Sequence, residues 1–490
     1  MKSRLLKTLI ALVVTILVAG GVYWQINFNK DWRQQYAYAK GVDAMVYSFP
    51  YQLNSTLLYL WGQPQRPEGY RGPVDAVNHF YHSSDADPKK YRDGGKPNLD
   101  TLYSIGWLYA KDQPLIISLP EIPNDRYYAL ELAGFDSDNF SYVGRRTHGN
   151  GGGNYAIVPP GWQGKLPDDV AFLAHNPTPW FLALGRTFID YNDPQDSARV
   201  NALLTQFKVV ALSDWGKENP PRPEHPPIAD VGKLSEMLLE GDVIAYLKEL
   251  VISDPLSFWN NVNHAMTING IPERDKNYLT DWAGLHIGPN QDIYQASDSE
   301  RAGLASAVVD GMMILKDYGL LKSYSGNRII NGWRFPPRSF GRCGTSGDYL
   351  IRSAIQSMKG IVANDPEEAI YMGTGTDQTG EELNGKNTYE IHFNPQQIPD
   401  AYFWSLTVYD TDGNLVLNPI DRYAIGDRSK HLVYEADGGL RIFVGKTPPK
   451  GKESNWLPAA ESRTMLTFRI YAPGKNVLEQ TWQPPPVKRL

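Results

Sequence analysis

The pattern of apolar and polar positions predicts short β-strands near both ends of the chain. Apolar side chains recur at every second position over residues 402–409 and again over residues 466–471. The first stretch runs into the turn D-T-D-G-N, and the apolar residues 415–417 follow it, which together are a hairpin signal. Two further apolar runs, residues 115–119 and 127–135, are bounded by prolines and polar turns. Short strands separated by turn residues are typical of β-sandwiches and jelly rolls.

The middle of the chain has helical spacing instead. Residues 234–250 are amphipathic, and a second apolar stripe begins after Pro255 and stops at Gly270. Ser297 to Glu300 is a capping box, which predicts a helix running to about Tyr318 with Gly319 as its stop.

A helical pattern also precedes the first strands. It covers residues 31–47 and is expected to end before Pro50, because proline lacks the amide hydrogen that the helix needs. A separate short element is expected at residues 53–61.

These patterns predict a mainly β, α+β protein. It has two jelly-roll-like β-sandwich domains with a helical segment between them, preceded by an N-terminal transmembrane helix. The expected parts are an anchor or signal segment at 1–26, an N-terminal sandwich with a leading helix at 27–225, a helical segment at 226–362 and a jelly-roll-like domain at 363–490.

The first residues predict where in the cell the protein is located. Lys2, Arg4 and Lys7 precede an uncharged apolar stretch from Thr8 to Val22. This is the pattern of a cleaved signal peptide, and equally of an uncleaved anchor that crosses the membrane once. The basic side stays in the cytoplasm. In either case we expect the chain after Asn27 to lie in the periplasm or outside the cell, and we favour the anchor.

The net charge and the cysteine count limit which partners and metal sites are expected. The formal net charge is −6, which gives no basic field for nucleic acid. Cys343 is the only cysteine, so an intrachain disulfide is excluded and a cysteine zinc site is not expected. No cofactor can be named from the sequence.

Candidate chemistry is densest between Lys96 and Pro160. If the chain is an enzyme, two carboxylates divide the acid and base roles and a histidine acts as base or ligand; these are Asp100, Asp136 and His82. Expected ligand-binding residues are Asn98, Tyr103, Arg126, Arg145 and Arg146. His79 and His82 would share a face of a helix and could hold a metal. The alternative is that all of these residues cap turns and form structural pairs.

Eight motifs carry a family resemblance. They are V-N-H-F-Y-H at 77–82, P-N-L-D-T-L-Y-S at 97–104, D-R-Y-Y at 125–128, G-R-R at 144–146, W-S-L-T-V-Y-D at 404–410, N-P-I-D-R-Y at 418–423, N-W-L-P at 455–458 and R-I-Y-A-P at 469–473. Through them the chain resembles a bacterial two-part family of domains of unknown function, DUF1254 followed by DUF1214. The resemblance implies two sandwiches around a helical segment, export, and self-association, with a trimer as one form. The final motif departs from the family pattern, which more often has a tryptophan before the proline.

Two functions stay open at this point. The chain is expected to bind a small polar or carbohydrate-like ligand or to assemble with partners; the alternative is an extracytoplasmic hydrolase or lyase acting on a glycan. Convergence of His82, Asp100, Asp136 and Arg145 in one pocket would favour the enzyme, and dispersal into separate turns would favour the binding protein.

Overall fold

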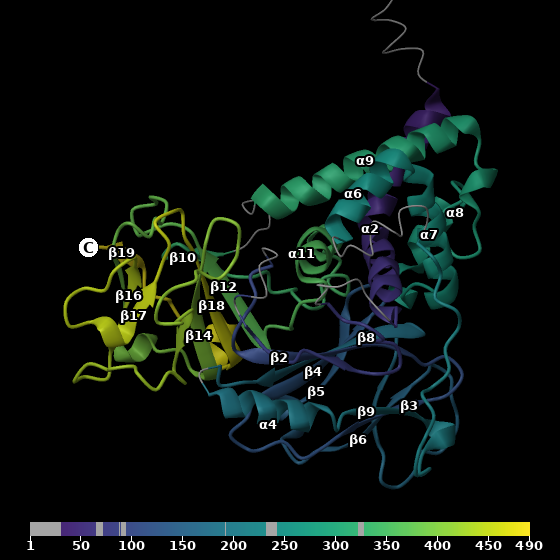
Figure 1. Ribbon diagram of the computed structural model, residues 1–490. Helices are drawn as coiled ribbons and strands as arrows, with labels where there is room; N and C mark the ends of the chain where they lie inside the picture. The colour runs from purple at the N-terminus through teal and green to yellow at the C-terminus, as the bar shows by residue number, and fades with distance from the viewer. Residues whose placement is uncertain are drawn as a thin grey trace, which may run out of the picture.

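The computed structural model places two β-sandwiches side by side, with a group of helices packed above the N-terminal one (Figure 1). It describes residues 31–64, 72–87, 89, 95–191, 193–231, 243–321 and 328–490. The described residues form four β-sheets, in two face-to-face pairs, together with the helices. The α+β class is therefore confirmed, as is the order of strands, helices and strands.

The N-terminal sandwich consists of a five-stranded and a four-stranded sheet. The first has the order β1 (Tyr81–His82), β2 (Thr101–Tyr109), β8 (Trp180–Phe188), β4 (Tyr128–Gly134) and β5 (Asn139–Gly144). The second has the order β7 (Ala171–His175), β6 (Gly153–Val158), β3 (Leu115–Leu119) and β9 (Lys208–Ala211). Apolar side chains such as Leu130 and Ile117 fill the space between the two sheets.

The C-terminal sandwich has a six-stranded and a four-stranded sheet. The larger has the order β10 (Ile329–Ile330), β11 (Trp333–Arg334), β12 (Ala369–Thr374), β18 (Met465–Pro473), β14 (Ala401–Tyr409) and β15 (Ala424–Gly426). The smaller has the order β17 (Trp456–Pro458), β16 (Leu440–Gly445), β13 (Tyr389–Phe393) and β19 (Val487–Arg489). Trp404, Phe468 and Ile442 lie in its core.

The two sandwiches share one topology. Strands β2 to β9 have the same sheet order as β12 to β19, taken in sequence, and each pair of equivalent neighbours has the same direction. The parallel pairs β6–β7 and β16–β17 correspond as well. A helix precedes the last strand in both, α4 (Pro194–Leu204) in the first and α12 (Lys475–Leu478) in the second. Residues of the two sandwiches can therefore be matched one to one through the registers.

The outer face of the five-stranded sheet has two covers. Trp107, Phe135 and Leu182 on this face belong to the same apolar cluster as the helices. Tyr127 and Ala129 instead meet Phe403 and Tyr471 of the C-terminal sandwich. We call this contact between the two sandwiches the seam.

The helical part is built around α2 (Trp32–Gly62) and α9 (Asp298–Leu321), which cross in close contact (Figure 1). Glycine permits this approach, because a Cβ atom at Gly303 would collide with the backbone oxygen of Gln34. The other helical segments are α6 (Val243–Ser253), α7 (Pro255–Asn269), α8 (Lys276–Ala283) and a run of α10 (Tyr349–Ile351), the π-helical segment η4 (Arg352–Ser357) and α11 (Met358–Gly360).

Helix α2 continues through Pro50, so the expected break before this residue is wrong. Proline cannot donate to the carbonyl oxygen four residues earlier. That oxygen, on Val46, accepts a hydrogen bond of 2.5 Å from the hydroxyl of Ser353 instead. The next carbonyl, on Tyr47, accepts from the buried guanidinium of Arg352. A distant segment thus supplies the donor that Pro50 removes.

Helix α9 begins as expected and ends later than expected. The side chain of Glu300 accepts from the backbone N–H of Ser297 at 2.8 Å, which confirms the capping box. The helix passes Gly319 and reaches Leu321, so a stop at Gly319 is wrong. Gly319 is needed for another reason: a Cβ atom there would lie 2.9 Å from the backbone oxygen of Ala354.

No helix within the described part of the chain is long and apolar enough to span a membrane. The segment predicted to be the anchor, residues 1–26, lies outside the described residues, as does the first half of the helix predicted at 234–250. The hairpin strand predicted at 415–417 is only an isolated bridge between Tyr409 and Leu415.

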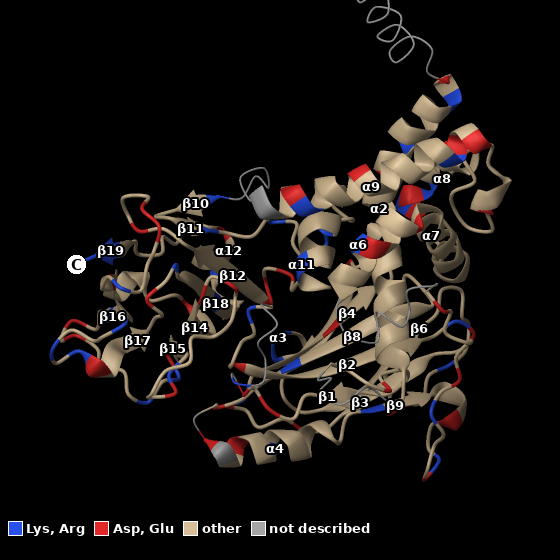
Figure 2. Ribbon diagram, turned by 45° about the horizontal axis from the view of Figure 1, so that its top comes forward, with Lys and Arg blue, Asp and Glu red and all other residues tan. Residues whose placement is uncertain are grey.

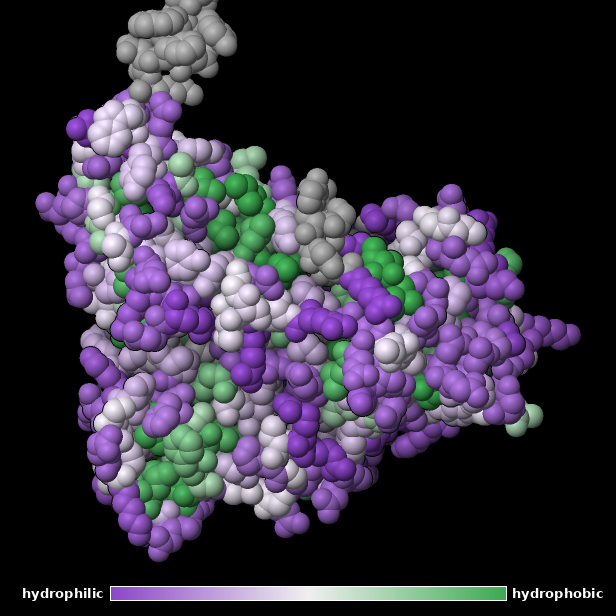
Figure 3. Space-filling model, turned by 180° about the vertical axis from the view of Figure 1, so that it is seen from behind, coloured by the Kyte–Doolittle hydropathy of each residue, from purple (hydrophilic) through white to green (hydrophobic). Residues whose placement is uncertain are grey.

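The surface carries both signs of charge. Acidic and basic residues are intermixed in Figure 2, mostly on loops and helices, and much of the strand surface carries neither. From behind, hydrophobic side chains form separate patches within a largely hydrophilic surface (Figure 3).

Candidate functional site

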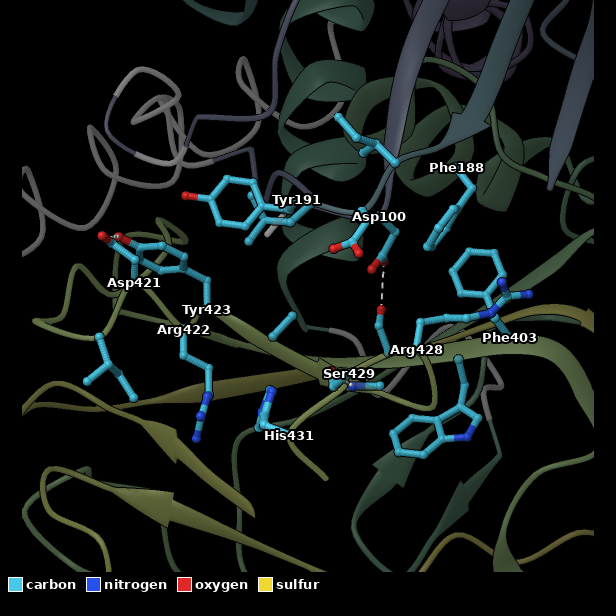
Figure 4. Close-up of a pocket in the computed structure, with 18 residues that line it drawn as sticks. Asp100, Phe188, Tyr191, Phe403, Asp421, Arg422, Tyr423, Arg428, Ser429 and His431 are labelled. Carbon is cyan, nitrogen blue, oxygen red and sulfur yellow. Dashed lines mark hydrogen bonds between the residues drawn. The ribbon is translucent and has the colours of Figure 1, made fainter. Parts of the chain in front are cut away.

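A pocket of about 170 Å³ opens at the edge of the seam. The N-terminal sandwich contributes Asp100 and the segment from Phe188 to Tyr191, and the C-terminal sandwich contributes the rest. Figure 4 shows Asp100 and Phe188 on one side of the space and Tyr423, Ser429 and His431 on the other. The pocket therefore exists only when both sandwiches are in place.

A tight turn positions Asp100 at the start of β2. The side-chain oxygen of Asn98 accepts from the backbone N–H groups of Asp100 and Thr101, both at 2.9 Å. The amide of Asn98 donates to the hydroxyl of Tyr103 at 2.6 Å. Such an asparagine turn forms from local sequence alone. It orients the carboxyl group of Asp100 toward the other sandwich.

The carboxyl group of Asp100 is buried against β14 and β18. Its Oδ2 accepts a hydrogen bond of 2.6 Å from Ser405, drawn in Figure 4, and a longer one of 3.4 Å from Tyr471. Burial raises the pKa of Asp100, although Arg469 and these hydrogen bonds oppose the rise. A carboxyl group of this kind can hold a proton at a higher pH than an exposed aspartate does.

The opposite wall carries basic groups. Arg422 donates to the backbone oxygens of Glu453 and Trp456 at 2.7 and 2.8 Å, so its hydrogen bonds go to neutral acceptors. The Nε2 atom of His431 is buried and has no hydrogen-bond partner among the described residues. Burial and the charge of Arg422 lower the pKa of His431, which keeps the ring neutral.

Arg428 lies between the pocket and the aromatic part of the seam. Its guanidinium group is 4.9 Å from the ring centre of Tyr402 and 5.2 Å from that of Phe188. Its one hydrogen bond, to the backbone oxygen of Asp125, is long at 3.3 Å. No carboxylate of the described residues lies within 4.0 Å of it. The carboxylate of Asp427, its neighbour in the chain, accepts from the backbone N–H of Trp404.

At the matching place on the other half of the seam, Arg146 and Thr147 also line a pocket, but Glu368 is not among the residues that line it. Glu368 precedes β12 as Asp100 precedes β2, and both backbone oxygens accept the equivalent bond, from Ala472 and from Ile189. The carboxylate of Glu368 accepts from Tyr127 at 2.7 Å and from Arg146 at 2.8 Å. We call this the closed half, and the half that contains Asp100 the open half.

The predicted ligand-binding residues are only partly brought together. Asn98 and Tyr103 lie beside Asp100, as described. Arg126 forms a two-pronged pair with Asp196, at 2.6 and 3.0 Å, below the seam. Arg145 binds the backbone oxygen of Asn124 and stacks on Tyr402. Arg146 belongs to the closed half and lines a different pocket.

Asp136 lies elsewhere, in the turn between β4 and β5 that faces the helices. Arg274 donates to it at 3.1 Å, and the fully buried Arg352 is 3.8 Å away. Burial and the neighbouring Asp138 raise the pKa of Asp136 to about 6. The two predicted catalytic carboxylates therefore occupy separate surroundings, with Asp136 in a network that joins the sandwich to the helices.

His82 lies on the short strand β1, so the expectation that it shares a helical face with His79 is wrong. Its Nδ1 is 2.8 Å from the hydroxyl of Ser104, and its ring packs on Phe80 and Phe207. Burial lowers its pKa to about 4. Within the described residues no group of three or more histidine, cysteine, aspartate or glutamate side chains could hold a metal ion.

Sequence reasoning missed Ser405, Arg422, Arg428 and His431. One signal could have found Arg428. The segment G-R-R-T at 144–147 reappears as G-D-R-S at 426–429, and in both the hydroxyl of the last residue accepts from the backbone N–H of the glycine. The repeat marks equivalent positions in the two sandwiches, and Arg428 stands where Arg146 does.

The geometry defines a class: an α+β protein of two topologically equivalent sandwiches with a ligand-sized pocket at the seam. Comparison with known families assigns the chain. Residues 77–211 match the protein of unknown function DUF1254, and residues 368–475 match the protein of unknown function DUF1214. The chain carries both parts of the two-part family, in the order that its motifs predict.

One solved structure shares the fold. The VPA0106 protein from Vibrio parahaemolyticus is similar with a TM-score of 0.68 and 21% identity, over 93% of this chain and 100% of that one. An uncharacterised protein from Burkholderia cenocepacia has a TM-score of 0.41 and 12% identity, over 97% of this chain and 98% of that one. No curated protein matches the chain. The first likeness shows the fold alone.

Proposed function

We propose that the chain binds a small polar, carbohydrate-like ligand in the pocket of the open half. The observation that carries this proposal is the composition of the pocket wall: a buried carboxyl group, hydroxyl groups and basic groups surround a space that also has aromatic sides. Sugars are recognised by this combination, since aromatic faces cover their C–H surfaces and polar groups fix their hydroxyls. Tyr191, Phe188 and Tyr423 supply the aromatic sides.

The first experiment is a binding screen by saturation-transfer NMR, followed by isothermal titration calorimetry. The ligands are neutral hexoses, their methyl glycosides and the corresponding uronic acids. We expect at least one compound to bind, and Asp100→Ala to weaken it by about tenfold or more, because a hydrogen bond to a buried carboxyl group is lost. The control is Asp168→Ala, whose side chain is exposed and paired only with Lys165. Binding that is unchanged in Asp100→Ala would contradict the proposal.

An enzymatic role in the same pocket is the second candidate, as a hydrolase or lyase acting on a glycan. It is favoured by Asp100, whose raised pKa suits a general acid, and by His431, whose neutral ring with a free Nε2 suits a base. A screen with chromogenic glycosides and unsaturated-product absorbance tests this role. Activity that is lost in both Asp100→Asn and His431→Gln, with binding retained, would support it.

We further propose that residues 1–26 anchor the protein in the cell membrane and hold the two sandwiches outside the cytoplasm. The support is the basic-then-apolar order of these residues. Protease digestion of spheroplasts tests it: the sandwiches should be cleaved without lysis, and the protein should stay in the membrane fraction. Self-association, with a trimer as one form, is tested by native mass spectrometry of the chain from Asn27 onward.

A further inference from the structure

The closed and open halves of the seam are two versions of one arrangement. In the registers, Arg186 of β8 lies opposite Tyr103 and Ala129, and Arg469 of β18 lies opposite Tyr371 and Ser405. These pairings match Glu368 to Asp100, and the repeat G-x-R-[ST] matches Arg146 to Arg428. The two halves can therefore be compared position by position.

In the closed half each arginine has a carboxylate of its own. Arg146 donates to Glu368 at 2.8 Å, and the buried Arg186 donates to the buried Glu131 at 2.5 Å. Both arginines of this half therefore form direct ion pairs.

In the open half both pairings are missing. The residue equivalent to Glu131 is Thr407, so Arg469 donates to a hydroxyl group, at 2.9 Å. The residue equivalent to Glu368 is Asp100, which is shorter by one methylene group and, within the described residues, forms no ion pair with Arg428. Arg428 lies over aromatic rings at the mouth of the pocket instead. No carboxylate of the described residues lies within 4.0 Å of this cation, and the carboxylate of Asp427 feels its charge only from further away.

We infer that the ligand of the open half supplies this carboxylate: it is a small organic acid, of the sugar-acid class, whose carboxylate pairs with Arg428 as Glu368 pairs with Arg146. This inference rests on the proposed function and names its ligand class. The hydroxyls of such a ligand would then lie toward Asp100, Ser405 and His431. A planar guanidinium group binds a carboxylate through two parallel hydrogen bonds, which fixes the orientation of the sugar.

A single negative charge suits this pocket better than a phosphate. Asp190 and Asp421 also line it. Lys430 pairs with Asp190 at 3.1 Å, and the hydroxyl of Tyr423 donates to Asp421 at 2.8 Å. A dianion would be repelled by these groups, whereas a carboxylate replaces one that the closed half already holds.

The test compares galacturonate with galactose, and glucuronate with glucose, by isothermal titration calorimetry on the chain from Asn27 onward. We expect the acid to bind at least tenfold more tightly than the neutral sugar. Arg428→Gln should remove this preference, while Arg33→Gln, an exposed arginine on α2, should keep it. A preference that survives in Arg428→Gln would overturn the inference.

A second variant tests the comparison itself. Asp100→Glu restores the length of Glu368, so its carboxylate should reach Arg428 and compete with the ligand. We expect galacturonate to bind at least tenfold more weakly, with no loss of thermal stability. Unchanged binding of the acid would count against the inference.

The two proposals fail differently. Equal binding of acid and neutral sugar would overturn the carboxylate inference and leave the binding function standing. Binding of neither class would overturn both.

Discussion

Glu368 and Asp100 each precede a long strand of one sandwich and reach across the seam to the other. Glu368 is held by Tyr127 and by a direct ion pair with Arg146. Asp100 is held by Ser405 and Tyr471, and a pocket remains beside it. The backbone is equivalent in the two halves, so the difference lies in a few side chains. The two halves differ by one methylene group, between Glu368 and Asp100, and by one replaced acid, since Thr407 is the equivalent of Glu131. These differences distinguish a structural contact from a candidate binding site.

The comparison also explains why a common fold does not give the two domains a common role. The aromatic centre of the seam is shared: Phe403 stacks on Tyr471 at 4.2 Å, and Phe188 and Tyr127 meet Phe403 at 5.1 and 5.5 Å. This apolar contact holds both halves. Once it is in place, one half can lose its ion pairs, because the other half and the aromatic rings still join the sandwiches.

The largest expected effect concerns the two central arginines. Arg186→Met leaves the buried Glu131 without its cation and should lower the free energy of unfolding by about 3–5 kcal/mol. Arg469→Met removes hydrogen bonds to neutral groups and should cost about 1–3 kcal/mol. Urea denaturation followed by tryptophan fluorescence measures both. The double variant Arg186→Met/Glu131→Leu should recover most of the loss, and an equal cost at the two arginines would break the comparison.

Exchanging the lengths of the two acids gives the next effect. Glu368→Asp cannot reach both Tyr127 and Arg146, and should lower the free energy of unfolding by about 1–3 kcal/mol. Asp100→Glu should change it by less than about 1 kcal/mol, because Arg428 is near the surface. The same denaturation experiment measures the pair. A larger cost for Asp100→Glu than for Glu368→Asp would show that the halves do not differ as described.

The hydroxyl of Ser405 has no counterpart in the closed half, where the equivalent residue is Ala129. Ser405→Ala removes the 2.6 Å hydrogen bond to Asp100 and should cost about 1 kcal/mol. Ser454→Ala, at an exposed site, should stay within about 0.5 kcal/mol of the native protein. A neutral Ser405→Ala would mean that water replaces the hydroxyl.

The smallest expected effect is a difference in pH dependence. Burial raises the pKa values of both Asp100 and Glu368, so the folded state holds these protons more tightly than the unfolded state does. Their contribution to stability is present below the usual carboxyl pKa and is lost as the pH rises through the raised values. Asp100→Asn and Glu368→Gln should each reduce this loss.

Asp196 should have the opposite effect on how stability depends on pH. Burial acts to raise its pKa, but hydrogen bonds from Arg126 and from the backbone of Asp190 outweigh burial and lower it. Its contribution is present above the usual pKa and is lost as the pH falls through the lowered one. Asp196→Asn should therefore flatten the acid side of the stability profile. The same direction of change in Asp100→Asn and Asp196→Asn would contradict the assignments.

The sequence predicted the strands that alternate or stand between prolines. The apolar run 115–119 is β3, and residues 402–409 fall within β14. Strand β8 gave no such signal, because it is buried on both faces, so its residues 180–184 are all apolar and do not alternate. It contains Arg186, whose place at the centre of the seam therefore stayed hidden.

Only part of the candidate site could be predicted from the sequence, for a similar reason. Asn98, Asp100 and Tyr103 belong to one local turn, and local hydrogen bonds follow from neighbouring residues. Arg428 and His431 come from a loop more than three hundred positions further on. Their approach to Asp100 depends on how two sandwiches pack, and periodicity within either sandwich carries no information about that contact.

The proline in α2 has a consequence for the order in which the protein takes shape during synthesis. The carbonyl of Val46 depends on a donor that lies 307 positions later in the chain. At ribosomal speeds of roughly 5–20 residues per second, that donor is made roughly 15 to 60 s after the helix is. Until then only water can donate to this carbonyl. The hydrogen bonding of α2 is therefore completed only after Ser353 has been synthesised. A chain truncated before Ser353 should expose the middle of α2 to chaperones and proteases.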